Sequence, residues 1–132
     1  MAFIKQQKPA RTGGSAAPMI TIGRSGAGKT TYLALNTAAR KALGDPVAVY
    51  LEWDADAFLL RLVASSPEDP AAYTITKGTG RLSVTAIMRE LGLIPRDRYT
   101  APGRPHGRQA LVVDVSEMRT ISPAQAALEA VA

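Results

Sequence analysis

The sequence contains no cysteine and only one histidine among its 132 residues. Without cysteine the chain can form neither disulfides nor thiolate metal sites. The single His106 lies in a stretch rich in proline and glycine, without a cluster of carboxylates around it. Aromatic residues make up only 5% of the chain, so the interleaved aromatics that stack bases in single-strand binders are missing. The sequence therefore predicts no metal site and no catalytic residues.

Long apolar runs are also missing. No run approaches the ~20 apolar residues that span a bilayer. Residues 1–18 lack the apolar stretch of a secretory signal. We therefore expect a cytoplasmic protein with no membrane contact. A hydrophobic content of 46% with 20% charged residues is typical of a folded globular chain.

Charge occurs in blocks along the chain. Residues 1–44 carry seven Lys or Arg and no acid, and residues 45–76 carry six acids against Arg61. Residues 77–108 carry seven basic residues and two acids, and the formal net charge of the whole chain is +5. Segregated positive charge favours an anionic partner, most often nucleic acid. The alternative is a solvated surface on which an acidic strand faces a basic one.

We predict an N-terminal arm, a compact domain and a helical tail, at residues 1–18, 19–118 and 119–132. The arm has paired glycines, two prolines and no apolar periodicity, which is typical of a flexible segment. The tail contains a helix, because Ser122 is a preferred N-cap residue and Pro123 suits the first helical position. The cations of the arm are Lys5, Lys8 and Arg11.

Short β-rich runs bounded by turn residues predict an antiparallel body. Two such runs flank the sequence DADA, Asp54 to Ala57, which is a strong hairpin signal. The expected strands cover residues 19–22, 47–53, 57–63, 72–76 and 110–115.

The stretch GRSGAGKT fits the phosphate-loop pattern G-x-x-x-x-G-K-[ST] at every fixed position. In such a loop, backbone N–H groups surround the phosphates, the lysine reaches the terminal phosphates and the hydroxyl holds magnesium at a helix start. An aspartate after the apolar run ALVVD fits the second magnesium ligand, so the chain resembles the P-loop NTPases in both of their motifs. The resemblance implies ATP or GTP with magnesium, bound by Gly23, Gly26, Gly28, Lys29, Thr30 and Asp114.

Three features of the sequence favour a hairpin over a phosphate loop. Only 18 residues follow Asp114, too few for the further parallel strands of an NTPase. The middle of the chain is predicted to form hairpins, and residues 45–80 contain no crossover helix. We therefore interpret the motif as coincidental and expect residues 30–36 to form a strand. A helix beginning at Lys29 would favour the nucleotide site instead.

An internal repeat supports the hairpin. The segment LALNTAARKALG (33–44) aligns with RLSVTAIMRELG (81–92) at an offset of 48, and a strand with a basic glycine turn precedes each copy. Downstream, VAVYLEW (47–53) is aligned with ALVVDV (110–115). We therefore predict an α+β fold, a small β-rich domain with two pseudo-repeated units of hairpin, short helix and strand. The units cover about 19–63 and 72–115, with helices near 37–43 and 85–91.

This order of elements resembles the SpoVT-AbrB or MazE-like family of swapped-hairpin β proteins. The resemblance is carried by Ala39-Arg40 and Leu43-Gly44 in the first copy, and by Arg89 and Leu91-Gly92 in the second. It implies an AbrB-like barrel built from two copies, often as a dimer, and in many members DNA binding through basic residues on hairpins and helix starts. The residues implied are Arg24, Lys29, Arg40, Lys41, Lys77, Arg81 and Arg89.

Three functions are open at this point. The first is a small DNA-binding, regulator-like protein with nucleic acid as its partner. The second is a structural or partner-binding protein of the same fold, such as a protein of a viral particle or one that binds a host factor. The third is an ATP- or GTP-binding P-loop protein, for which alone an NTPase activity and a cofactor are expected.

Overall fold

The computed structural model describes residues 3–4 and 17–131. From Met19 onward, the order strand, strand, helix, strand, strand occurs twice. The first half comprises β1 (Met19–Ser25), β2 (Thr30–Leu35), α1 (Thr37–Ala42), β3 (Ala48–Asp54) and β4 (Leu59–Ser65). The second half comprises β5 (Tyr73–Thr74), β6 (Arg81–Ser83), α2 (Thr85–Leu91), β7 (Tyr99–Pro105) and β8 (Ala110–Asp114). A last helix, α3 (Pro123–Val131), follows the second half.

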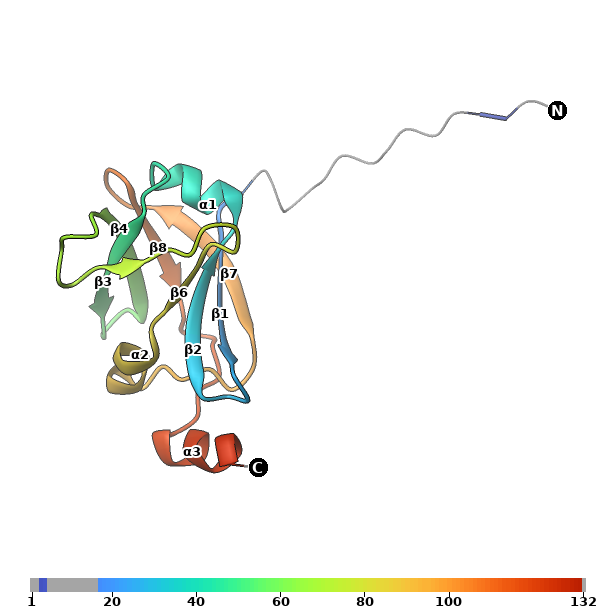
Figure 1. Cartoon of the computed structure of the whole chain (residues 1–132), viewed down its shortest axis with the longest axis vertical. Helices are drawn as coiled ribbons and strands as arrows, with labels where there is room; N and C mark the ends of the chain where they lie inside the picture. Colours follow the sequence, from blue (N-terminus) through green and yellow to red (C-terminus); the bar gives the residue numbers. More distant parts are fainter. Residues whose placement is uncertain (1–2, 5–16, 132) are drawn as a thin grey trace.

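The strands form one antiparallel sheet that curls into a nearly closed barrel (Figure 1). Their order in the sheet is β5-β3-β4-β8-β7-β1-β2-β6. The two end strands meet, because the N–H of Thr76 donates to the carbonyl of Arg81 at 2.8 Å. The protein is therefore a small strand-rich α+β barrel, which agrees with the predicted fold class at this level.

Exchange of the two halves leaves the strand order unchanged. When each strand of the first half changes places with its equivalent in the second, β1 with β5 through β4 with β8, the order of strands around the ring stays the same but is read in the opposite direction. The contact between β2 and β6 is symmetric at the backbone as well. The N–H of Leu35 donates to Gly80 at 2.9 Å, and the N–H of Val84 donates to Thr31 at 2.9 Å. A pseudo-twofold axis therefore passes between β2 and β6 and between β4 and β8.

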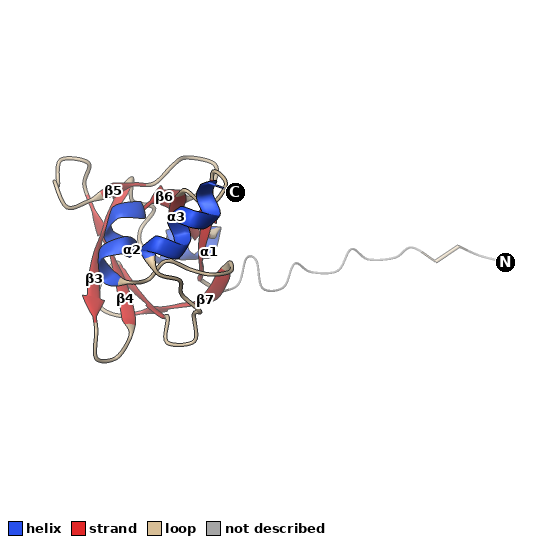
Figure 2. Cartoon of the chain, turned by 90° about the horizontal axis from the view of Figure 1, so that it is seen from below, coloured by secondary structure: helices blue, strands red, loops and turns tan. Residues whose placement is uncertain are grey.

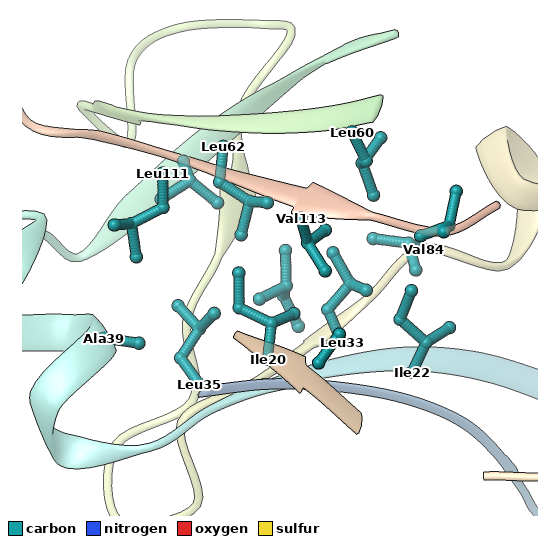
Figure 3. Packing of buried hydrophobic residues seen from close by; sticks show 14 of the residues in the cluster. Ile20, Ile22, Leu33, Leu35, Ala39, Leu60, Leu62, Val84, Leu111 and Val113 are labelled. Carbon is teal, nitrogen blue, oxygen red and sulfur yellow. The ribbon is translucent and has the colours of Figure 1, made fainter. Parts of the chain in front are cut away.

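Alternating side chains of the strands fill the barrel (Figure 3). Ile20 and Ile22 from β1 meet Leu60 and Leu62 from β4 on the opposite wall, and all four are fully buried. Removal of one such side chain to alanine typically costs ~2–5 kcal/mol, so these residues fix the position of each strand. Figure 1 shows α1 and α2 at opposite ends of the barrel, and Figure 2 shows α2 and α3 in front in the view from below. Ala39 of α1 and Met88 of α2 are buried in the same core.

The two short helices lie where the repeat predicts them. They begin at Thr37 and Thr85, an offset of 48 residues. Gly44 and Gly92 follow the helices with φ of 83° and 72°, a left-handed conformation that glycine adopts without a steric cost. In α3 the backbone N–H of Gln125 donates to Ser122 Oγ at 3.1 Å, as the predicted N-cap requires.

The alignment of the repeat downstream of its helices was wrong. The partner of β3 in the second half is β7, which the sequence analysis did not predict, and β8 corresponds to β4. The strand was missed because Pro102 and Pro105 lie within it, and proline cannot donate to a ladder. The predicted strand at 72–76 is also shorter, at Tyr73–Thr74.

Most of the predicted basic arm, residues 1–2 and 5–16, lies outside the described residues. Its last two residues are joined to the barrel, since Asn36 Nδ2 donates to Ala17 O at 2.9 Å and the Gly103 N–H donates to Pro18 O at 2.9 Å. Of the helices in the described part, none has the length and apolar character needed to cross a membrane.

Candidate nucleic-acid interface

The stretch that matches the phosphate-loop pattern forms the β1–β2 hairpin. Gly26, Ala27 and Gly28 have φ of 63°, 58° and 85° and form its turn, closed by the Lys29 N–H bonded to Gly26 O at 3.2 Å. The Thr30 hydroxyl, predicted as the alternative magnesium ligand, lies 2.8 Å from Ser25 Oγ across the hairpin. The glycines therefore serve the left-handed turn, and the threonine connects the two strands.

This hairpin does not have the geometry of a phosphate loop. Residues 30–35 form β2, and the first helix begins only at Thr37, so no helix N-terminus faces the turn. Asp114 ends β8, and β7 separates that strand from β1. Its carboxylate accepts the Ser116 N–H at 2.9 Å, and hydrogen bonds from Ser116 hold the pKa of Asp114 below its usual range. The prediction of a strand at residues 30–36 is confirmed.

Several exposed acids lie across the barrel from β1. In the ring of eight strands, β3 and β4 are four places away from β1 and β2. The acidic block of the sequence, residues 45–76, forms β3, β4, β5 and their loops, with exposed Glu52, Asp54 and Asp56. Glu52 and Asp54 on β3 therefore lie across the barrel from Arg24 on β1, whereas Asp45 of the same acidic block lines a cleft with Arg40 and Lys77.

The predicted cations form two clusters related by the internal repeat. Lys29 at the β1–β2 turn and Arg89 in α2 line one cleft of about 190 Å³, here called the α2-end cluster. Lys77 at the β5–β6 turn and Arg40 in α1 line a second cleft of about 160 Å³, the α1-end cluster. Each cluster therefore combines the lysine of a hairpin turn with the arginine of a short helix, and Asp45 also lines the α1-end cleft. Lys41, which follows Arg40, is exposed.

Two further arginines of the predicted set contact Tyr32 or lie next to it. The guanidinium of Arg81 stacks on the Tyr32 ring, with Cζ 4.2 Å from the ring centroid. Tyr32 also packs on Gly23, where an added Cβ would lie 2.6 Å from the tyrosine oxygen. Arg24 lines a groove of about 460 Å³ beside the same tyrosine. The ring is thus already in contact with a glycine and a guanidinium, so it offers little free surface to an unstacked base.

The groove beside Tyr32 contains two cations that the sequence analysis did not single out. Arg96 and Arg98 lie on the loop after α2 and line the groove with Arg24, whose Nη2 donates to Arg96 O at 3.1 Å. Both are exposed. The sequence placed them in a basic block, but only the fold brings this loop to the β1–β2 hairpin.

Few of these cations have an acidic partner. In the part of the chain that the structure describes, two ion pairs form, Arg24 with Glu129 and Arg61 with Glu52. Arg61 is the single cation among residues 45–76, which carry six acids, so this block is negative overall. Across the described residues no three His, Cys, Asp or Glu side chains gather to hold a metal. The arrangement suits contact with phosphate groups, because unpaired Lys and Arg bind phosphates by charge and hydrogen bonds.

No family model, no curated protein and no solved structure matches this chain significantly. The likeness to swapped-hairpin proteins therefore depends on the sequence motifs alone and stays a prediction.

Proposed function

We propose that the protein binds duplex DNA through the cation-bearing side of an AbrB-like barrel and acts as a regulator rather than an enzyme, in the cytoplasm. The observation that carries this proposal is the symmetric placement of the two cation clusters. A turn lysine and a helix arginine occur at each end of the β2–β6 contact, and the exposed Glu52 and Asp54 of β3 lie across the barrel.

The spacing of the clusters suits a duplex. They lie beyond opposite ends of β2, whose six residues span about 20 Å at ~3.3 Å per residue. A duplex has local twofold axes through its base pairs, so a protein with a pseudo-twofold axis can make equivalent contacts with both strands. Arg81, close to the middle of this face, adds a cation between the clusters. Contacts of this kind give affinity, whereas sequence readout needs base contacts.

Binding of a labelled duplex at several salt concentrations tests the proposal. Wild type should bind with a steep loss of affinity as salt increases, because each phosphate contact releases counterions. Lys29→Gln and Lys77→Gln should each reduce the slope of log K against log salt by about 0.9, the value for one lost contact. Deletion of residues 1–16, which removes the three cations of the arm but keeps the bonded Ala17 and Pro18, should reduce it further.

Arg61→Gln is the matched control for charge. It removes one positive charge, as the lysine variants do, but on the strand β4, where Arg61 pairs with Glu52. It should leave the salt slope unchanged. If wild type retains no duplex at low salt, where the electrostatic contribution is largest, the DNA-binding function is refuted.

A protein partner or a second copy of the chain is the other candidate, and Phe58 supports it. This residue at the turn between β3 and β4 is 48% exposed and has φ of 54°, a conformation unusual for a bulky side chain. Its ring meets Trp53 edge-on at 5.8 Å between centroids. Sedimentation velocity of wild type and Phe58→Gly tests self-association through this turn. A wild type that stays monomeric at high concentration would remove the homodimer.

A further inference from the structure

Helix α3 lies over one of the two cation clusters. Ala126 and Ala127 of α3 line the α2-end cleft together with Lys29 and Arg89. The equivalent α1-end cleft is lined only by residues between Arg40 and Lys77, so no described segment covers it in the same way. The internal symmetry of the barrel is therefore broken at the candidate interface itself. Figure 1 shows α3 below the barrel, at the end where α2 lies.

The attachment of α3 to the barrel is small. Ala126 packs with Ile94 and Ile121 in a cluster separate from the main core. The N–H of Ile121 donates to Ile94 O at 3.0 Å, just before the helix begins. Leu128, two residues further along α3, is 69% exposed. Since little apolar surface holds the helix, α3 can leave the cleft without disturbing the interior of the barrel.

The polar contact of α3 is made with a cation of the candidate interface. Glu129 Oε2 lies 3.5 Å from Arg24 Nη1. The Arg24 side chain is only 15% exposed, and its other terminal nitrogen donates to the Arg96 carbonyl. Arg24 is thus held in place, with one nitrogen directed at an anion. Carboxylate and phosphate oxygens are interchangeable partners for such a guanidinium.

We propose that α3 is a displaceable cover of the α2-end cluster and of the neighbouring Arg24, in which the Glu129 carboxylate occupies the place of a DNA phosphate on Arg24. The helix and the DNA backbone then compete for the same arginine, and α3 lowers the affinity for DNA at this end only. This inference rests on the proposed DNA-binding function. The α1-end cluster, without a cover, binds phosphate independently of α3.

Glu129→Gln tests the competition against Glu117→Gln, each measured with a labelled duplex at low salt. Both variants remove one negative charge, and therefore increase the general attraction to DNA equally, but only Glu129 is paired with Arg24. Glu117 is exposed in the segment before α3. We expect E129Q to bind the duplex about threefold tighter than E117Q, a factor within the range of one partly exposed ion pair. Equal affinities of the two variants would overturn the proposal.

The Arg24→Gln background shows whether the gain acts through Arg24. In this background E129Q and E117Q should bind DNA equally, because the position for which the carboxylate competes has been removed. A threefold gain that persists without Arg24 would mean that Glu129 acts elsewhere, and the competition would be refuted.

A second probe separates this inference from the DNA-binding function. Short-chain inorganic polyphosphate supplies phosphate groups without bases or a duplex, and its binding to the same variants can be followed by calorimetry. If no variant retains DNA but E129Q binds polyphosphate about threefold tighter than E117Q, the DNA-binding function fails and the competition at Arg24 stands. If neither anion distinguishes the two variants, α3 is only a structural appendage.

Discussion

Gly80 is the described glycine at which an added methyl group would disturb the pairing of β2 with β6. Its φ is 66°, and a Cβ on this residue would lie 2.4 Å from the carbonyl oxygen of Leu35. The same contact includes a hydrogen bond, in which the Leu35 N–H donates to Gly80 O at 2.9 Å. Gly80→Ala therefore forces β6 away from β2 while the bond between them requires that they stay close. Gly78→Ala is the matched control, because Gly78 has φ of 87° but no atom within 4 Å of an added Cβ.

The magnitude follows from three contributions. A left-handed alanine costs about 1–2 kcal/mol, and this is the whole expected effect at Gly78. At Gly80, forcing a methyl group into a packed site adds about 1–3 kcal/mol, and weakening the bond to Leu35 adds about 1 kcal/mol. We therefore expect Gly80→Ala to lower the free energy of unfolding by about 3–6 kcal/mol.

Thermal unfolding followed by circular dichroism measures both variants. An unfolding entropy of about 2.1 cal/mol/K per residue gives ~280 cal/mol/K for this chain, so 1 kcal/mol corresponds to ~4 °C. Gly78→Ala should lower Tm by about 4–7 °C and Gly80→Ala by about 10–20 °C. Equal shifts for the two variants would refute the reasoning, because backbone strain alone would then explain both.

Three smaller perturbations have defined outcomes. Burial, and then the Asp114 carboxylate, raises the pKa of Tyr99, so the native state holds the phenol proton more tightly than the unfolded state does. The contribution of Tyr99 to stability should be complete below pH ~10 and should be lost as the pH rises through the folded pKa. Tyr99→Phe should reduce this loss of stability, measured by urea unfolding at high pH. Asn36→Ala should lower the free energy of unfolding by about 2 kcal/mol, measured in urea, because Asn36 Oδ1 caps α1 and also accepts the Met19 N–H at 3.0 Å. Asp54→Ala should lower the free energy of unfolding by about 1 kcal/mol in the same assay, since Asp54 Oδ1 accepts two backbone N–H groups of its turn. Asp54→Asn should lower it clearly less, because the asparagine side chain also carries an acceptor oxygen at this position.

Local signals were sufficient to predict the helices and most strands. The capping residues before α3 and the glycines after α1 and α2 specify where helices begin and end, and the residues that flank DADA alternate as strand residues do. The prolines of β7 had the opposite effect. Pro102 is tolerated in β7 because the neighbouring Gly103 N–H supplies the hydrogen bond to the adjacent chain segment, at Pro18 O. This acceptor cannot be identified from the sequence without the fold.

The candidate interface was predictable only in part, because its components are distant in sequence. The turn lysines and helix arginines could be selected by residue type and by the repeat. Their pairing across the halves could not, since Lys29 meets Arg89 of the second copy rather than Arg40 of its own. This exchange of partners follows from a strand order in which β2 pairs with β6.

The phosphate-loop pattern has a structural explanation in the two turns of the barrel. At the first turn Gly26 and Gly28 provide positive φ, and Lys29 follows them. At the second, Gly78 and Gly80 provide the same conformation, with Lys77 before them. Both turns therefore use glycines to reverse the chain tightly and place a lysine at an end of the barrel, and only the order of residues differs. A pattern defined by glycine and lysine spacing cannot separate such a turn from a nucleotide loop. The burial of the residues that follow can, because Thr31, Leu33 and Leu35 are buried and alternate with exposed or half-buried neighbours, as in a strand.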